Sequence, residues 1–435
     1  MIDVGAAVEP LGIASPVPMS GFAARTAPST GEHDVLGARA LAMDECVLIT
    51  LDVCALEEGT CWAIAKAVHP DAPEKVIVTA THTHAGPCST PTRLSRCTPE
   101  VEQQLVAAGA AAGRSARATQ RPCVMSYSAA HGVGVASNRR HADRRVDPPV
   151  QMLRFMSADS NTENAVPAAL SDARAGAQVV ATLLTYPCHP VVLDGTNRML
   201  SGDYIHPLRE RIEVTYPGSV AVFATGCAGD INTGHRAEAS YALQSSERRT
   251  FAEAHRVGAR IAEAALDSEP QAIDANRVVA ASREVTLQFD RPNAAKVAED
   301  AARWVRERAE AAPGHAALLD IWIEWARTVP KDTEWKGRVS VQSLGSVTLV
   351  ALPGEPFLAV AEEISAQLTK RTGGPCLVIG YADGCPGYFP TEGEYAYGGY
   401  EVADAHRYYG MPGPFASGSA EVLIESTVAA WPAGG

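Results

Sequence analysis

The chain has 435 residues, 46% of them hydrophobic, and can bury the large core of a globular protein. Its formal net charge of −13 argues against a nucleic-acid partner, which would require a basic surface. No apolar run reaches the roughly 18 residues that cross a bilayer, and the N-terminus lacks the pattern of a signal peptide. The ten cysteines form no C-x-x-C pair. We therefore expect a cytoplasmic protein with reduced thiols and no stable membrane association.

Strand-like and helical segments alternate along the first two thirds of the chain. Apolar runs that predict strands cover residues 45–56, 76–82, 178–190 and 219–230, and Ala-rich runs that predict helices cover 99–117 and 249–267. Alternation of this kind predicts an α/β fold, with a mixed, mainly parallel sheet flanked by helices.

The pattern changes in the last third of the chain. Residues 277–289 predict an edge or hairpin strand, and residues 293–329 predict two amphipathic helices. A strand pair in 339–356 then restores the β pattern. Because no long linker interrupts the chain, we expect a single domain, 1–435, with a helical insertion at 290–335.

The segment KVIVTATHTHAGP, residues 75–87, places two histidines at the end of an apolar run. The β-branched residues and the closing Gly-Pro predict a buried strand followed by a loop. Side chains two apart on a strand point the same way, so we expect His82 and His84 to share one region. Imidazole is the commonest metal ligand and a good acid or base near neutral pH. A solvated strand end would have the same sequence, so the motif needs partners.

Three more polar residues follow predicted strands: His189, Glu355 and Tyr388. Ligand sites in open α/β sheets lie outside the carboxyl ends of the strands. Two or three histidines with one carboxylate, and one position left open for water, are typical of a catalytic zinc site. His189 can also be an ordinary loop histidine, and Glu355 a helix-start carboxylate. Spacing alone supports either interpretation.

Five motifs resemble, in this order, those of the neutral, non-lysosomal ceramidase family: THTHAGP, CHPVVLDGTNRMLSGDY, FATGCAGDINTG, ALPGEPF and GYFPTEGEYAYGGYE. The opening GFAARTAPSTGEHDVLGARALAM is also similar to the start of that family, and the resemblance extends to about residue 430. It implies an α/β catalytic domain that hydrolyses an amide bond with one zinc ion per chain.

Motif by motif, the resemblance also implies the ligands of the metal. These are His82, His189, Glu355 and Tyr388. Tyrosine is an uncommon zinc ligand because its free pKa is about 10, so the metal would have to hold Tyr388 as a phenolate.

Further residues receive roles from the same motifs. The resemblance places His84 beside the metal, where it assists the bound water or the developing oxyanion, and His84 is our candidate acid for the leaving amine. Arg139 would bind the polar part of the substrate, and Tyr400 would line the same pocket. We interpret Asp203 and Asp230 either as carboxylates that orient the histidines or as ordinary loop and turn residues.

The chain also departs from the family. The familiar ceramidases carry a C-terminal β-sandwich domain and are exported or membrane-associated, whereas this chain stops shortly after Tyr400. Cys227 stands in the segment where the family commonly has a serine, and we interpret it as a small buried thiol rather than a nucleophile. These departures lead us to expect a substrate other than ceramide.

We therefore predict a zinc-dependent amidohydrolase that acts on a small-molecule or N-acyl substrate. The alternatives are an esterase or lactonase with the same metal site, and a non-catalytic metal-binding scaffold. Formation of a homo-oligomer and a native metal other than zinc both stay open.

Overall fold

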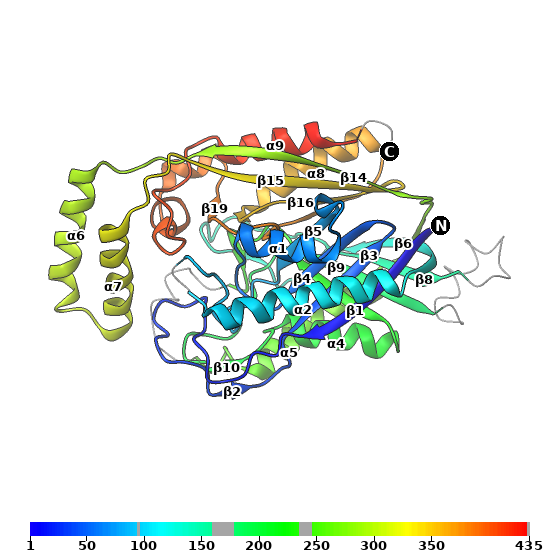
Figure 1. Cartoon of the computed structure of the whole chain (residues 1–435), viewed down its shortest axis with the longest axis horizontal. Coiled ribbons are helices and arrows are strands. Elements are labelled where there is room, and N and C mark those ends of the chain that lie inside the picture. The colour runs from blue at the N-terminus through cyan, green and yellow to red at the C-terminus, as the bar shows by residue number, and fades with distance from the viewer. Residues whose placement is uncertain (94–95, 159–177, 235–245, 433–435) are drawn as a thin grey trace.

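A computed structural model describes residues 1–93, 96–158, 178–234 and 246–432 (Figure 1). Its largest element is a mixed sheet in which β13 (Gln271–Ile273) pairs with β6. The other strands follow the order β11 (Val220–Thr225), β9 (Val179–Tyr186), β8 (Val150–Ser157), β6 (Arg121–Ala130), β1 (Ile2–Pro10), β3 (Gly37–Met43), β4 (Cys46–Leu51) and β5 (Val76–Ala80).

The expected mixed sheet is confirmed, but its strands are not mainly parallel. Only β4–β5 and β9–β11 pair in parallel among the described strands of this sheet, and the other pairs are antiparallel. A two-residue turn at Asp44 and Glu45 joins β3 to β4, and such a turn forces antiparallel pairing. Both faces of this sheet are covered, so its strands are apolar on both sides, as parallel strands usually are.

A second, four-stranded sheet lies against the first. Its order is β14 (Val278–Gln288), β15 (Glu334–Leu344), β16 (Val347–Ala351) and β18 (Cys376–Ile379). One face shares a hydrophobic core with the large sheet, and the other packs against α8 (Leu358–Thr372) and α9 (Ser419–Ala430). The two sheets therefore form the inner layers of the molecule (Figure 1).

Two pairs of helices cover the outer face of the large sheet. Helices α1 (Glu58–Val68) and α2 (Pro99–Ala118) pack on β3, β4 and β5. Helices α4 (Ile205–Thr215) and α5 (Phe251–Asp267) pack on β8, β9 and β11. Alternation along β4 shows the layering, because Val47 and Ile49 face the helices and Leu48 faces the second sheet.

Helices α6 (Ala294–Arg308) and α7 (Pro313–Thr328) form a hairpin between β14 and β15 that projects from the body of the molecule (Figure 1). They are the two helices expected within residues 293–329. No described helix is long and apolar enough to span a membrane. The short elements are β2 (Gly31–Glu32), β7 (Ser137–Asn138), β10 (Met199–Leu200), β12 (Ile231–Asn232), β17 (Glu355–Pro356), β19 (Tyr388–Phe389), η1 (Pro73–Lys75), η3 (Glu392–Tyr397), η4 (Tyr400–Asp404) and η5 (Ala405–Arg407).

Strands of both sheets end close to one another. Just beyond β5, the carbonyl of Thr81 accepts a hydrogen bond of 2.7 Å from Oγ1 of Thr225, the last residue of β11. The amide of Gly380, which follows β18, donates to the carbonyl of Thr225 over 3.0 Å. The loops that follow β5, β11 and β18 are thereby brought together. The short pair β17–β19 adds Glu355 and Tyr388 in direct register.

Candidate metal centre

Three buried side chains converge at this meeting point of strand ends. Oε2 of Glu355 lies 2.9 Å from Nε2 of His189 and 3.2 Å from Nε2 of His82. None of the three residues is more than 1% exposed. Bonds of about 2.0–2.1 Å to a tetrahedral zinc place neighbouring ligand atoms about 3.3 Å apart. The cluster therefore has the composition and spacing of a metal site.

Two of these atoms also lack any other partner. Nε2 of His189 and Oε2 of Glu355 are buried and form no hydrogen bond with the residues that the structure describes. They approach each other, but not in hydrogen-bonding geometry. A buried polar atom without a partner costs about 1–3 kcal/mol. A divalent cation between them would satisfy both atoms, so these residues fit a metal ion.

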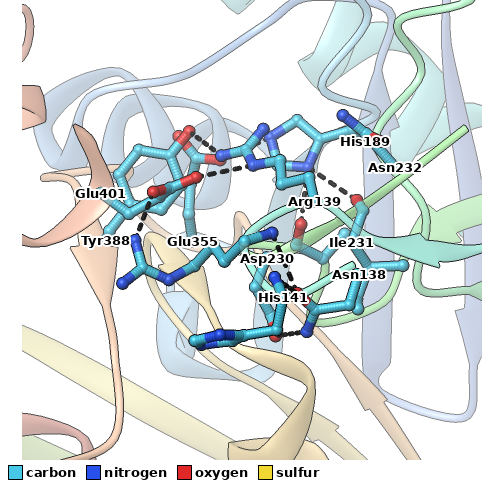
Figure 2. A network of polar contacts seen from close by, with 12 residues as sticks. Asn138, Arg139, His141, His189, Asp230, Ile231, Asn232, Glu355, Tyr388 and Glu401 are labelled. Atoms are coloured by element: carbon cyan, nitrogen blue, oxygen red, sulfur yellow. Dashed lines mark hydrogen bonds and ion pairs between the residues drawn. The ribbon is translucent and has the colours of Figure 1, made fainter. Parts of the chain in front are cut away.

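Backbone carbonyls fix the two imidazoles from behind. Nδ1 of His82 lies 2.6 Å from the carbonyl of Cys54, and Nδ1 of His189 lies 2.6 Å from the carbonyl of Ala228. A nitrogen this close to a carbonyl carries a proton, so Nε2 is the atom of each ring that is left to bind a metal ion at the centre. Figure 2 shows His189 beside Ile231, whose carbonyl is a second acceptor at 3.1 Å.

His82 and His84 lie close together, but not by alternation along a strand as predicted. Strand β5 ends at Ala80, and His82 has φ of +65°, so the pair does not continue a strand. A positive φ is unusual for a non-glycine residue and turns the chain sharply. The side chains nevertheless share one region, because Nε2 of His84 lies 3.2 Å from Nε2 of His82.

The N-terminal loop holds the ring of His84 in place. A Cβ on Gly21, which has φ of +99°, would lie 2.6 Å from Cβ and Cγ of His84, so only glycine fits there. The ring of Phe22 packs edge-to-face on His84 at 5.2 Å. Burial, and then the neighbouring His82 and His189, hold the pKa of His84 well below its usual value. His84 is therefore a neutral imidazole at physiological pH.

Glu355 remains a carboxylate despite its burial. Burial alone would raise its pKa, but the adjacent His82 and His189 outweigh burial and hold that pKa well below the usual value. Conversely, burial opposes a charge on His82, but the Glu355 carboxylate prevails and raises the pKa of His82 to about 10. The hydroxyl of Tyr409 donates a hydrogen bond to Oε1 of Glu355. Glu355 thus favours positive charge at the centre.

Tyr409 is a site residue that the sequence reasoning missed. It lies in the segment AHRYYG, which matches none of the motifs used above. Its aromatic neighbour Tyr408 also lines the cavity described below. The pair of tyrosines a few residues beyond Tyr400 was the available signal.

Tyr388 lies next to Glu355 in the β17–β19 pair. Its hydroxyl accepts a hydrogen bond of 3.1 Å from Nη2 of Arg139, whose guanidinium lies 5.5 Å from the centre of the Tyr388 ring. Burial, reinforced by Glu355, holds the pKa of Tyr388 well above its usual value. Without a metal ion beside it, this hydroxyl stays protonated.

A network of ion pairs holds Arg139 from the other side (Figure 2). Nε of Arg139 lies 2.7 Å from Glu401, and Nη1 of Arg140 lies 2.6 Å from the other oxygen of the same carboxylate. Nε2 of His141 lies 2.8 Å from Glu394. These contacts join the 139–141 segment to the segment that carries Tyr400.

A cavity of ≈ 300 Å³ opens beside the centre. His82, His84, Glu355, Tyr388 and Tyr400 all line it, as the sequence analysis expected for residues of one site. The predicted residues His189 and Arg139 adjoin it through Glu355 and Tyr388. Half of the remaining lining residues are apolar or aromatic: Pro18, Met19, Phe22, Ala23, Ala27, Ala55, Ile321, Tyr408 and Tyr409.

The two aspartates and the cysteine do not contact the histidines in the described part of the chain. Asp203 accepts the backbone amide of Leu193 at 2.9 Å, and Asp230 accepts that of Leu358 at 2.8 Å. They anchor loops, and backbone carbonyls orient the imidazoles in their place. Cys227 lies in an apolar core, where burial raises the pKa of its thiol far above the usual range. It is not an activated nucleophile.

Comparison with known proteins identifies the fold. The neutral ceramidase from Pseudomonas aeruginosa superposes with a TM-score of 0.69 over 98% of this chain and 73% of that chain, at 16% sequence identity. A ceramidase complexed with C2 gives 0.70 over 98% and 74%, at 15% identity. No protein-family model matches the chain, and no curated protein matches its sequence. The chain therefore has the neutral ceramidase fold, as the sequence motifs indicated.

Proposed function

We propose that this protein is a zinc-dependent hydrolase that cleaves amide bonds in small N-acyl compounds. The observation that carries the proposal is the buried cluster of His82, His189 and Glu355, whose ligand atoms all lie within 4.8 Å of one another beside a cavity. The likeness to two ceramidase structures supports amide chemistry on this fold.

His82, His189 and Glu355 would hold the zinc ion, with Tyr388 as the fourth protein ligand. Zinc, when bound, would polarise the amide carbonyl and lower the pKa of its water towards about 7. Tyr409 would hold the Glu355 carboxylate in orientation through its hydrogen bond.

His84 would handle the proton of the reaction. Its ring is neutral, borders the cavity and lies 3.2 Å from Nε2 of His82. It can accept a proton early in the reaction and return it to the leaving amine, as general acid–base catalysis requires. Arg139 and Tyr400 would orient the substrate, Arg139 through its contact with Tyr388 and Tyr400 from the cavity wall.

The cavity favours a small substrate. Its volume of ≈ 300 Å³ is at the lower end of the range for small-molecule pockets, about 300–1,000 Å³. A short or aromatic acyl group fits this space better than a long lipid chain.

Metal content tests the proposal directly. Mass spectrometry of the protein produced with zinc should find about one zinc per chain in the wild type and little in His82→Ala, His189→Ala or Glu355→Ala. His131→Ala is the matched control, because that imidazole is 66% exposed and lies outside the cluster, and it should keep the zinc. A folded wild type without metal would overturn the proposal.

The role of His84 has its own test. His84→Ala should nearly abolish amide hydrolysis but keep appreciable activity on an activated ester, whose leaving group needs little protonation. Equal losses on both substrates would exclude His84 as the acid for the leaving amine.

A further inference from the structure

Arg25 is a buried cation in the wall of the cavity. It is 7% exposed, and its guanidinium donates to three backbone carbonyls: Asn197 at 3.2 Å, His84 at 2.7 Å, and Ser20. A guanidinium has five N–H donors, so two remain. Nε is one of them, and it is buried without a partner among the described residues.

No carboxylate lies within ion-pair distance of Arg25 in the part of the chain that the structure describes. Two other arginines of this region differ: Arg93 pairs with Glu58 at 2.6 Å, and Arg139 pairs with Glu401 at 2.7 Å. Arg249 likewise donates to backbone carbonyls and has no described ion pair, but it is less buried than Arg25. Asp194 is near enough to favour the charge of Arg25 but does not contact it. Burial lowers the pKa of Arg25 to about 10, so it stays protonated at neutral pH. Buried charges are normally paired, and this one is not.

We propose that Arg25 binds a carboxylate of the substrate, and that the preferred substrates are N-acyl amino acids. The inference rests on the proposed amide hydrolysis and narrows it to one class of amide. Glu355 is the only acidic residue in the described cavity wall, and it belongs to the metal centre. An anionic group of the substrate would therefore meet cationic donors and no competing carboxylate.

Arg25 lies close to His84. Its guanidinium bonds to the backbone of His84, the proposed acid for the leaving amine. Phe22 holds the two in a fixed relation, because its ring centre lies 5.1 Å from the guanidinium carbon and 5.2 Å from the His84 ring. In an N-acyl amino acid, one carbon separates the amide nitrogen from the carboxylate, about 2.5 Å across two bonds. The leaving amine and its carboxylate would then face His84 and Arg25.

A matched pair of compounds tests the inference. N-acetyl-L-phenylalanine and N-acetyl-2-phenylethylamine differ only in the carboxylate. We expect zinc-loaded wild type to prefer the first by ~10- to 100-fold in kcat/KM, the worth of one hydrogen-bonded charge pair. Calorimetry on zinc-loaded His84→Ala protein should show a similar preference in affinity, without turnover.

Variants assign the preference to Arg25. Arg25→Met should bring the ratio of kcat/KM for the two compounds close to one. Arg25→Lys keeps the charge and should keep part of the preference. That result would show that the effect depends on the charge and not on misfolding of the methionine variant. Arg249→Met is the control, because Arg249 lies 5.8 Å from the Phe22 ring but does not line the cavity, and the ratio should not change.

Two results would overturn the inference: no preference in the wild type, or a preference that Arg25→Met leaves intact because it lowers kcat/KM equally for both compounds. If neither compound is hydrolysed but the preference in affinity persists and needs Arg25, carboxylate binding stands and the proposed hydrolysis fails.

Discussion

The hydrogen bond from Tyr409 to Glu355 should contribute more to the free energy of unfolding than a hydrogen bond from a tyrosine to a neutral acceptor. Its acceptor is an ionised carboxylate that is 0% exposed, and hydrogen bonds to charged groups contribute about 1.5–3 kcal/mol. Tyr409→Phe would leave Oε1 of Glu355 without a described donor. We expect the free energy of unfolding to fall by about 2–3 kcal/mol.

Tyr395→Phe is the comparison that isolates the charge. The Tyr395 hydroxyl donates to neutral carbonyls, those of Phe415 at 3.0 Å and Ala416 at 3.2 Å. Its loss should cost about 0.5–1.5 kcal/mol. Urea denaturation of both variants and the wild type, after treatment with a chelator, measures the difference without contributions from metal. An equal or smaller loss in Tyr409→Phe would refute the reasoning.

Three further substitutions test other parts of the structure. Gly21→Ala would push a Cβ against His84 and should lower activity on an N-acyl substrate ~100-fold without loss of zinc, to be checked by parallel kinetics and metal analysis. Burial raises the pKa of Asp203 from 3.8 to about 6, so the folded state binds this proton more tightly than the unfolded state. The protein should therefore lose about 3 kcal/mol of stability as pH rises from about 4 to 6. Asp203→Asn should remove this loss, which denaturation curves across the same pH range would measure. Arg407 lies 4.6–5.7 Å from the rings of Trp304, Trp322 and Trp325, so Arg407→Ala should cost about 1–2 kcal/mol and speed proteolysis of the α6–α7 hairpin; unchanged cleavage would argue against a role for this contact.

The sequence predicted that the proposed ligand residues lie together, but not which backbone features bring them together. His82, His189 and Glu355 each follow a strand, as their motifs indicated. Their convergence, however, comes from strands of two sheets and from a left-handed turn at His82. A positive φ at a histidine leaves no mark in a hydrophobic pattern. The order of the motifs along the chain predicted this set of residues, which hydrophobic periodicity alone does not.

Other features depend on contacts between distant segments and were not predictable from local pattern. The prediction of mainly parallel strands rested on the alternation of strand-like and helical segments. Local pattern does not show which strands pair, and most neighbours in the described large sheet pair antiparallel. Arg25 and Tyr409 gain their importance from what surrounds them in space. Arg25 matters because no acid pairs with it among the described residues, and a missing neighbour cannot be read from the chain around position 25.

The spread of the metal centre along the chain affects how the protein can be made. His82 is synthesised early, whereas Glu355 follows after most of the chain and Tyr409 later still. Contacts between residues so distant in sequence form late in folding, because closing a long loop costs entropy before any contact repays it. A ribosome-bound nascent chain that ends before Glu355 would present two imidazoles and no carboxylate. High-affinity binding of the proposed zinc ion should therefore begin only after the ribosome has synthesised Glu355.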